Sequence, residues 1–275
     1  MTPREQFFAA LRRERPEGLV PHLELEFQLA EEAFGEPLLN GALLEGKTGL
    51  ERQDMLKHNA ELLVKIAETY KYCTLVGTHW LPMEDQQATF GYLRELAGDT
   101  YAFNGFVDGT FSIPSGSQMM DFVTWIADRP EEVHEAAERQ TEAAINHAKA
   151  LREAGAEVVF MCADYCFNDG PFLSPNMFRE FVTPYLTRQI TAMKAMGLYV
   201  VKHTDGDIMP IIDQLVEAGP HALHSIDPMA GVDIKKVKEL YGDQVALIGN
   251  VNCAWVQDGS PDRKSTRLNS SHVSQ

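Results

Sequence analysis

Apolar and polar residues recur along the chain with two periods, one typical of helices and one typical of strands. Stretches with apolar residues at helical spacing predict amphipathic helices that cover a core. Shorter apolar runs between them predict strands. The predicted helices are 49–70, 130–154, 175–196, 208–218 and 234–241, and the predicted strands are 21–27, 72–77, 102–108, 157–164, 198–205, 222–227 and 245–252.

A further helix is predicted at the start of the chain. Thr2 and Glu5 have the spacing of a capping box, in which the two side chains satisfy backbone N–H groups of the first turn. Pro3 stands at the first helical position, where its missing N–H costs nothing. We expect this helix to end before Pro16.

The predicted elements follow a repeated order of strand and then helix. This order favours parallel strands joined by helical crossovers. Seven strands are predicted, whereas a closed (β/α)8 barrel has eight. We therefore expect an α/β fold, a (β/α)8 TIM barrel truncated before its last strand. A doubly wound open sheet is the alternative.

The C-terminal residues do not continue this pattern. Residues 262–272 read DRKSTRLNSSH, which is the translation of a common sequencing adapter. Segments of this kind do not belong in an argument about the fold. We therefore predict an incomplete barrel domain at residues 1–261 and a non-native tail at residues 262–275.

The composition of the chain limits which binding partners and which cellular compartment we expect. The formal net charge of -16 repels phosphate backbones and anionic lipids, so we expect neither nucleic acid nor a membrane as partner. The four cysteines include no close CxxC pair, and we find no signal peptide and no apolar run of membrane length. We expect a cytoplasmic protein with free thiols, for which a homodimer is compatible.

Polar residues gather at the predicted strand ends, where a barrel carries its chemistry. His203 and Asp205 are two positions apart and share a face, so they can bind zinc or act in acid–base catalysis, or simply form an ion pair. Glu26 points inward if the first strand alternates as predicted, and faces solvent if its register differs. The predicted metal ligands are His203, Asp205 and Glu26.

Other strand ends supply candidate catalytic residues. These are Asp164, Asp227 and Asn250, with Asp164 acting as an acid, a base or an orienting group. Each acid alone also suits a turn or a helix cap. The stretch 169–171 predicts a loop placed to fold over the site. The sequence has no Walker A motif, dinucleotide fingerprint or nucleophile elbow.

Several short motifs are informative through their order and spacing. They are Thr2-Pro3-Arg4-Glu5 with Ala9-Ala10-Leu11, Asp169-Gly170-Pro171 with Ser174-Pro175, His203-Thr204-Asp205-Gly206, Gly219, and Gly249-Asn250-Val251-Asn252. Together they resemble the uroporphyrinogen decarboxylase superfamily over nearly all of residues 1–261. The resemblance implies a (β/α)8 barrel with a deep cleft at the strand ends.

This superfamily contains two chemistries, which differ near the first strand. Uroporphyrinogen decarboxylases bind a substrate with many carboxylates and carry an arginine-rich segment there. The present chain has the glutamate-rich stretch 24–32 instead, and no arginine lies between Arg15 and Arg52. A site entrance lined with glutamates disfavours the binding of a polyanionic substrate.

The other branch consists of zinc-dependent methyltransferases that work with corrinoid proteins. Their metal motif is His-x-Cys, with a further cysteine from the last strand. His203 matches the histidine, whereas Asp205 stands at the cysteine position. The resemblance implies a zinc ion that acts as a Lewis acid, for example on the oxygen of a methoxylated compound. The oxygen ligand makes this site harder than a thiolate site and favours a different metal or substrate.

From this resemblance we predict a metal-dependent methyltransferase. It would move a methyl group between a methylated small molecule and a corrinoid protein or thiol, with zinc as cofactor and the corrinoid carried by a partner protein. The first alternative is uroporphyrinogen decarboxylase itself, an enzyme of porphyrin biosynthesis, because fold does not fix function. The second alternative is a non-catalytic binding barrel.

Overall fold

The computed structural model describes residues 1–75 and 78–258, which divide into two compact units. The predicted tail at residues 262–275 lies outside the described residues. In the described ranges, no helix is both long and apolar enough to cross a membrane. The first unit comprises Met1–Phe106, His147–Val159 and Met196–Leu198, and the second comprises Val107–Asn146, Phe160–Ala195 and the chain from Tyr199 onward.

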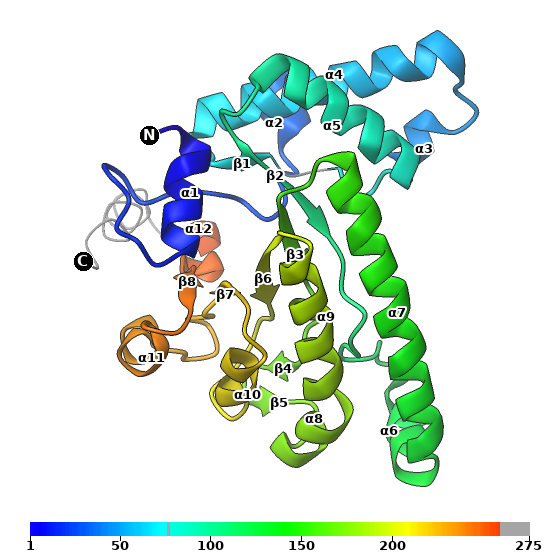
Figure 1. The fold of residues 1–275 in the computed structure, drawn as a ribbon, viewed down its shortest axis with the longest axis vertical. Helices are drawn as coiled ribbons and strands as arrows, with labels where there is room; N and C mark the ends of the chain where they lie inside the picture. The colour runs from blue at the N-terminus through cyan, green and yellow to red at the C-terminus, as the bar shows by residue number, and fades with distance from the viewer. Residues whose placement is uncertain (76–77, 259–275) are drawn as a thin grey trace. The chain divides into compact units, whose positions relative to one another are not determined.

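Two long helices, α4 (Gly49–Tyr70) and α5 (Met83–Ala97), lie against each other in the first unit (Figure 1). Helix α4 has the bounds that its periodicity predicts, because Leu62, Leu63 and Ile66 recur on its buried side. The other elements of this unit are α1 (Pro3–Leu11), α2 (Ala30–Phe34), α3 (Gly41–Leu44), β1 (Thr74–Leu75) and β2 (Ala102–Phe106).

The predicted capping box at the start of α1 is confirmed. The Thr2 hydroxyl oxygen accepts the Glu5 N–H at 3.2 Å, and the Glu5 carboxylate accepts the Thr2 N–H at 2.8 Å. These bonds satisfy donors that the first turn of a helix leaves free. Helix α1 ends at Leu11, before Pro16, as predicted.

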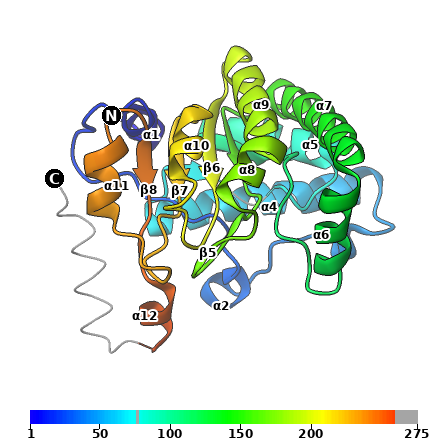
Figure 2. The ribbon, with the colours of Figure 1, turned by 90° about the horizontal axis from the view of Figure 1, so that it is seen from below.

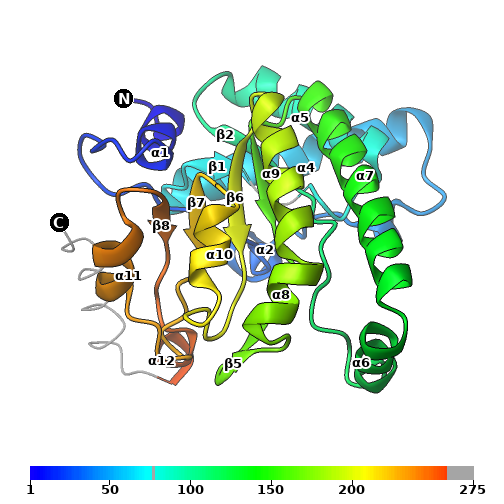
Figure 3. The ribbon, with the colours of Figure 1, turned by 60° about the horizontal axis from the view of Figure 1, so that its bottom comes forward.

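The second unit contains three consecutive parallel strands, β6 (Tyr199–His203), β7 (Ala222–His224) and β8 (Ala246–Ile248). Helices α9 (Thr183–Ala195), α10 (Ile212–Glu217) and α11 (Ile234–Tyr241) stand next to one another in the same order as these strands (Figures 2 and 3). Other elements of the unit are α6 (Met119–Asp128), β4 (Cys166–Phe167), β5 (Gly170–Pro171), α8 (Pro175–Phe181) and α12 (Cys253–Asp258).

Helix α7 (Pro130–Ala154) and strand β3 (Val158–Met161) have residues in both units. The strand order is β1-β2-β3 in the first unit and β3-β6-β7-β8 in the second. Every residue of β3 is fully buried, which is typical of a parallel strand covered on both faces. The structure thus confirms parallel strands with helical connections, and six of the seven predicted strands form. Five of these are shorter than predicted, and the end of the strand predicted at 72–77 lies outside the described residues.

The predicted first strand, 21–27, is wrong. Its single ladder contact is a parallel bridge between His22 and Tyr72. The alternation that suggested a strand is present, since Glu24 and Glu26 are exposed while Leu25 between them is half-buried. A strand requires backbone pairing along its length as well as alternating side chains, and this segment has too little of it.

Proline explains two corrections to the predicted helices. The helix predicted at 175–196 is broken at Val182 into α8 and α9. Pro184 lies in the first turn of α9, where a proline is tolerated because it needs no intrahelical partner. The helix predicted at 208–218 begins at Ile212, after Pro210. A proline farther inside the helix would lack an N–H donor and its ring would clash with the preceding turn.

Candidate metal centre

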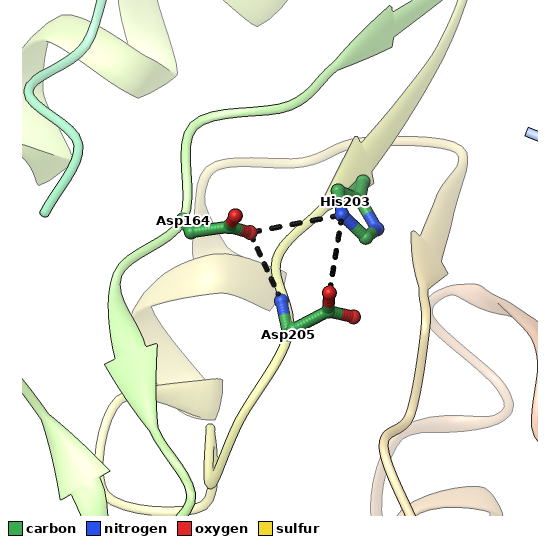
Figure 4. Close-up of side chains that lie close together, drawn as sticks. All are labelled: Asp164, His203 and Asp205. Carbon is green, nitrogen blue, oxygen red and sulfur yellow. Dashed lines mark hydrogen bonds and ion pairs between the residues drawn. The ribbon is translucent and has the colours of Figure 1, made fainter. Parts of the chain in front are cut away.

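Three polar side chains of the second unit meet beyond the carboxyl ends of β3 and β6 (Figure 4). His203 is the last residue of β6, Asp205 follows two positions later, and Asp164 follows β3. The His203 Nε2 atom lies 3.6 Å from Asp164 Oδ1 and 3.8 Å from Asp205 Oδ2. Neighbouring parallel strands end at the same edge of a sheet, so two strands suffice to bring these three groups together.

The cluster is buried at its imidazole and open at its carboxylates. The side chain of His203 is 10% exposed, whereas those of Asp164 and Asp205 are 45% and 58% exposed. A cation held here would therefore keep one side toward solvent. An open side is what distinguishes a catalytic metal site from a closed structural one.

A second histidine fixes the ring of His203. The Nδ1 atoms of His203 and His224 lie 2.7 Å apart, so one nitrogen donates and the other accepts. The two residues are register partners across β6 and β7. Ligand histidines commonly have their second ring nitrogen held in this way, because the contact sets the tautomer and the ring orientation.

Burial controls the charge of these two rings. Burial and, to a smaller extent, the nearby His203 ring lower the pKa of His224 to about 4, although Asp205 opposes the shift. Burial also lowers the pKa of His203, although Asp205 and Asp164 oppose that shift. Both rings are therefore neutral at neutral pH, and a neutral imidazole is the form that binds a metal.

Each carboxylate is held by a hydrogen bond from the chain. The Asp164 Oδ1 atom accepts the backbone N–H of Asp205 at 3.2 Å. The Ser225 hydroxyl donates to Asp205 Oδ1 at 2.5 Å. These bonds orient the two carboxylates toward the same space as His203.

The donor set fits a divalent metal ion. Ligands about 2.1 Å from a tetrahedral ion lie roughly 3.4 Å from one another, close to the separations of 3.6 and 3.8 Å around His203. Within residues 1–75 and 78–258, this is the one group of three such side chains whose ligand atoms all lie within 4.8 Å. One nitrogen and two carboxylate oxygens suit zinc and harder ions better than soft ones.

The other predicted site residues lie elsewhere. Glu26 belongs to the first unit, where its carboxylate lies 3.0 Å from His79 Nε2. Asp227 caps a loop, since its oxygens accept the N–H groups of Gly206 and Met229 at 3.3 and 2.8 Å. Asn250 follows β8 and is half-buried. The roles assigned to these three residues stay predictions.

The predicted loop at 169–171 is part of a small hairpin. Cys166 of β4 pairs with Pro171 of β5, and Asp169 lies at the turn. The Asp207 N–H donates to the Phe167 carbonyl at 2.8 Å, which ties the hairpin to the loop that follows the cluster.

The prediction from sequence missed His224, Ser225 and the buried residue Lys202. His224 and Ser225 end the strand next to β6, and a search of every strand end for polar residues would have found them. In the part of the chain that the structure describes, none of the four cysteines forms a disulfide.

Comparison with known proteins gives a consistent classification. The profile of the family described as uroporphyrinogen decarboxylase (URO-D) matches residues 87–269. A methylcobamide:CoM methyltransferase, MtaA, from Methanosarcina barkeri is 27% identical over 161 residues, and its counterpart from strain Fusaro is 25% identical. In each case the match covers 58% of this chain and 45% of the relative, so the chain spans less than half the length of the curated relatives it matches.

A solved structure shares the fold. It is a methyltransferase from Methanosarcina mazei with a TM-score of 0.70, and the likeness covers 91% of this chain and 83% of that one. At 19% identity, this likeness bears on the fold alone.

Proposed function

Because the chain belongs to the uroporphyrinogen decarboxylase family, we propose that it is a metal-dependent methyltransferase of that family. It would move a methyl group between a methylated small molecule and a corrinoid protein or thiol. One observation carries the proposal, namely the cluster of His203, Asp164 and Asp205 at the strand ends. The relatives from Methanosarcina barkeri support it, since their name describes methyl transfer between a methylated corrinoid and a thiol.

The proposed ligands are the His203 Nε2 atom and one oxygen each from Asp164 and Asp205. A bound zinc ion would supply Lewis acidity, either polarising the oxygen that carries a methyl group or stabilising a thiolate. His224 would keep the Nδ1 atom of His203 occupied, which leaves Nε2 free to bind. The exposed carboxylates would leave one side of the site open to substrate.

The charge of the site argues against a porphyrinogen substrate. The carboxylates of Asp164 and Asp205 lie 3.6 and 3.8 Å from His203 Nε2, and burial lowers the pKa of that ring, so a neutral imidazole does not offset their negative charge. A substrate with many carboxylates would therefore meet a negative field. Uroporphyrinogen decarboxylase nevertheless remains the second candidate, because the matching family profile carries that description.

Metal analysis of the purified chain tests the proposed ligands. We expect about one zinc ion per chain, and we expect His203→Ala to lose it. His147→Ala, at an exposed position on α7, is the matched control and should keep the metal. Zinc-free wild-type protein, or an unchanged zinc content in His203→Ala, would contradict the proposal.

An activity assay separates the two chemistries. Free methylcobalamin and a small thiol can be supplied together, and demethylation of the corrinoid followed by its absorbance. We expect demethylation that His203→Ala abolishes and that the His147→Ala control retains. Formation of coproporphyrinogen from uroporphyrinogen at an enzymatic rate would favour the second candidate instead.

A further inference from the structure

A fully buried lysine lies beside the proposed ligand His203. The side chain of Lys202 is 0% exposed, and its ammonium donates to Asp108 Oδ2 at 2.8 Å, to the Ala163 carbonyl at 2.8 Å and to the Met161 carbonyl at 3.3 Å. An ammonium has three donors, so these acceptors satisfy it completely. The aromatic ring of Tyr165 lies 4.2 Å from the same nitrogen.

The carboxylate of Asp108 accepts further hydrogen bonds besides the one from Lys202. Its Oδ2 atom also accepts the Ala163 N–H at 2.9 Å, and its Oδ1 atom accepts from the backbone and hydroxyl of Thr110 at 2.9 and 2.6 Å. Burial by itself would raise the pKa of Asp108, but the Lys202 charge and these hydrogen bonds hold it below its ordinary value. Asp108 is therefore ionised at neutral pH.

Together the two side chains hold both polar backbone groups of Ala163, the residue directly before Asp164. Asp108 takes its N–H and Lys202 takes its carbonyl. The Ser112 hydroxyl lies 3.2 Å from both the backbone nitrogen and the backbone oxygen of Asp164. The backbone that carries Asp164 is thus fixed, although the Asp164 side chain is 45% exposed.

Stability alone does not account for a buried ion pair of this kind. The desolvation of two charges costs several kcal/mol per ion, and well-packed apolar residues often replace such a pair without loss. An apolar pair cannot form directional hydrogen bonds, so it cannot hold one peptide group in one orientation. The distinctive effect of this pair is therefore the placement of residues 163–164.

We propose that Lys202 and Asp108 are positioning residues that place Asp164 against His203 for metal binding. This inference rests on the metal centre of the proposed function. Neither side chain touches the metal in this proposal, and both act through the backbone of Ala163.

Three variants of the full chain separate positioning from stability. Lys202→Met and Asp108→Asn each leave a buried polar group without its partner, so both should lose stability and zinc affinity. The double variant Lys202→Met/Asp108→Leu removes both charges. We expect it to regain only the part of the lost stability that an unpaired buried charge costs, because the backbone groups of Ala163 still lack these two partners. We also expect it to bind zinc about 10- to 100-fold more weakly than wild type, the usual effect of removing a supporting contact at a metal site.

The measurements are urea unfolding, zinc affinity by competition with a chromophoric chelator, and hydrogen exchange of the peptide that covers residues 163–165. Exchange in that peptide should be faster in the double variant. The control is Arg52→Met/Asp85→Leu, which removes a mostly buried ion pair whose hydrogen bonds stay within the first unit. It should leave zinc affinity unchanged.

The outcomes distinguish the two proposals. A double variant with wild-type zinc affinity would overturn the positioning role, and so would unchanged exchange at residues 163–165. Wild-type protein that binds no zinc would overturn the proposed function. In that case, faster hydrogen exchange at residues 163–165 in the double variant would still show that Lys202 and Asp108 fix the backbone of Ala163 and Asp164.

Discussion

At the residue scale, the proposed metal centre depends on the proton that His203 and His224 share. With the proton on His203 Nδ1, the Nε2 lone pair faces Asp164 and Asp205 and can bind a cation. His224 must then accept at its own Nδ1, which requires that ring to be neutral. Its pKa of about 4 meets that requirement across the physiological range.

The pKa of His224 predicts how stability depends on pH. The folded value of about 4 lies below the ordinary 6.5, so the unfolded chain binds more protons between these limits. The contribution of His224 is fully present above about pH 6.5, and it is lost progressively as the pH falls toward 4. We expect a loss on the order of 1–3 kcal/mol across this window.

Urea unfolding of the metal-free protein at pH 7 and pH 5 measures this effect. In His224→Asn the difference in the free energy of unfolding between the two pH values should shrink, because asparagine has no proton to bind. A variant whose difference equals that of wild type would show that other groups cause the pH dependence.

The metal centre was partly predictable from single residues. The period of two in a strand places His203 and Asp205 on one face, and the end of the preceding strand supplies Asp164. The register between β6 and β7 brings His224 to His203, and no local pattern encodes that pairing. Lys202 was missed because a lysine in an apolar strand gives no sign of a partner 94 positions away.

At the scale of elements, the hairpin of β4 and β5 rests on the backbone at Gly206. Gly206 has a φ of +86°, and a Cβ atom there would lie 2.5 Å from the Cys166 carbonyl oxygen and 2.6 Å from that of Phe167. Backbone atoms cannot give way as a flexible side chain can. The hairpin and the loop after Asp205 therefore fit together only with glycine at this position.

Gly206→Ala should therefore displace the hairpin and disturb the metal centre. We expect a loss of at least 1–3 kcal/mol in the free energy of unfolding, roughly the cost of one strained backbone position, together with weaker zinc binding. Gly231→Ala is the matched control, since Gly231 has a φ of +78° and open space around its Cβ position. Equal losses in the two variants would mean that φ strain alone is responsible and that the contact is not.

Among the elements, three helices formed with the predicted bounds. The bounds of α4, α7 and α11 follow from their periodicity and their flanking residues, whereas helix α5 was not predicted. The strand predicted at 21–27 is wrong because alternation indicates which side chains share a face. It does not indicate whether a neighbouring strand is present to pair with the backbone. Strand formation depends on partners that are distant in sequence.

At the scale of the whole molecule, the predicted non-native tail leads to a test of closure. A barrel removes its sheet edges by closing, and an unclosed one leaves strands with unpaired backbone groups. If the tail predicted at residues 262–275 stands in place of a last strand, the chain should aggregate or exchange segments with a second copy. A chain whose residues after Pro261 are replaced by a natural family ending should be monodisperse and should melt cooperatively.

Size-exclusion chromatography and thermal unfolding of the two chains make this comparison. If the present chain is already monodisperse and melts cooperatively, with no gain from the new ending, the predicted truncation of the barrel is wrong. The order of strands and helices, which sequence periodicity predicted, does not depend on this outcome.

The route of the chain through the two units has a practical consequence for protein engineering. The chain passes from one unit to the other at residues 106/107, 146/147, 159/160, 195/196 and 198/199. No single cut can therefore release either unit as a continuous polypeptide. Split-protein reporters or domain exchanges with a relative would have to carry residues 107–205 across as one block. A block that omits Asp108 or Lys202 would break up that ion pair, and one that omits Asp164 or His203 would break up that cluster. A boundary placed at 159/160 would interrupt β3 itself.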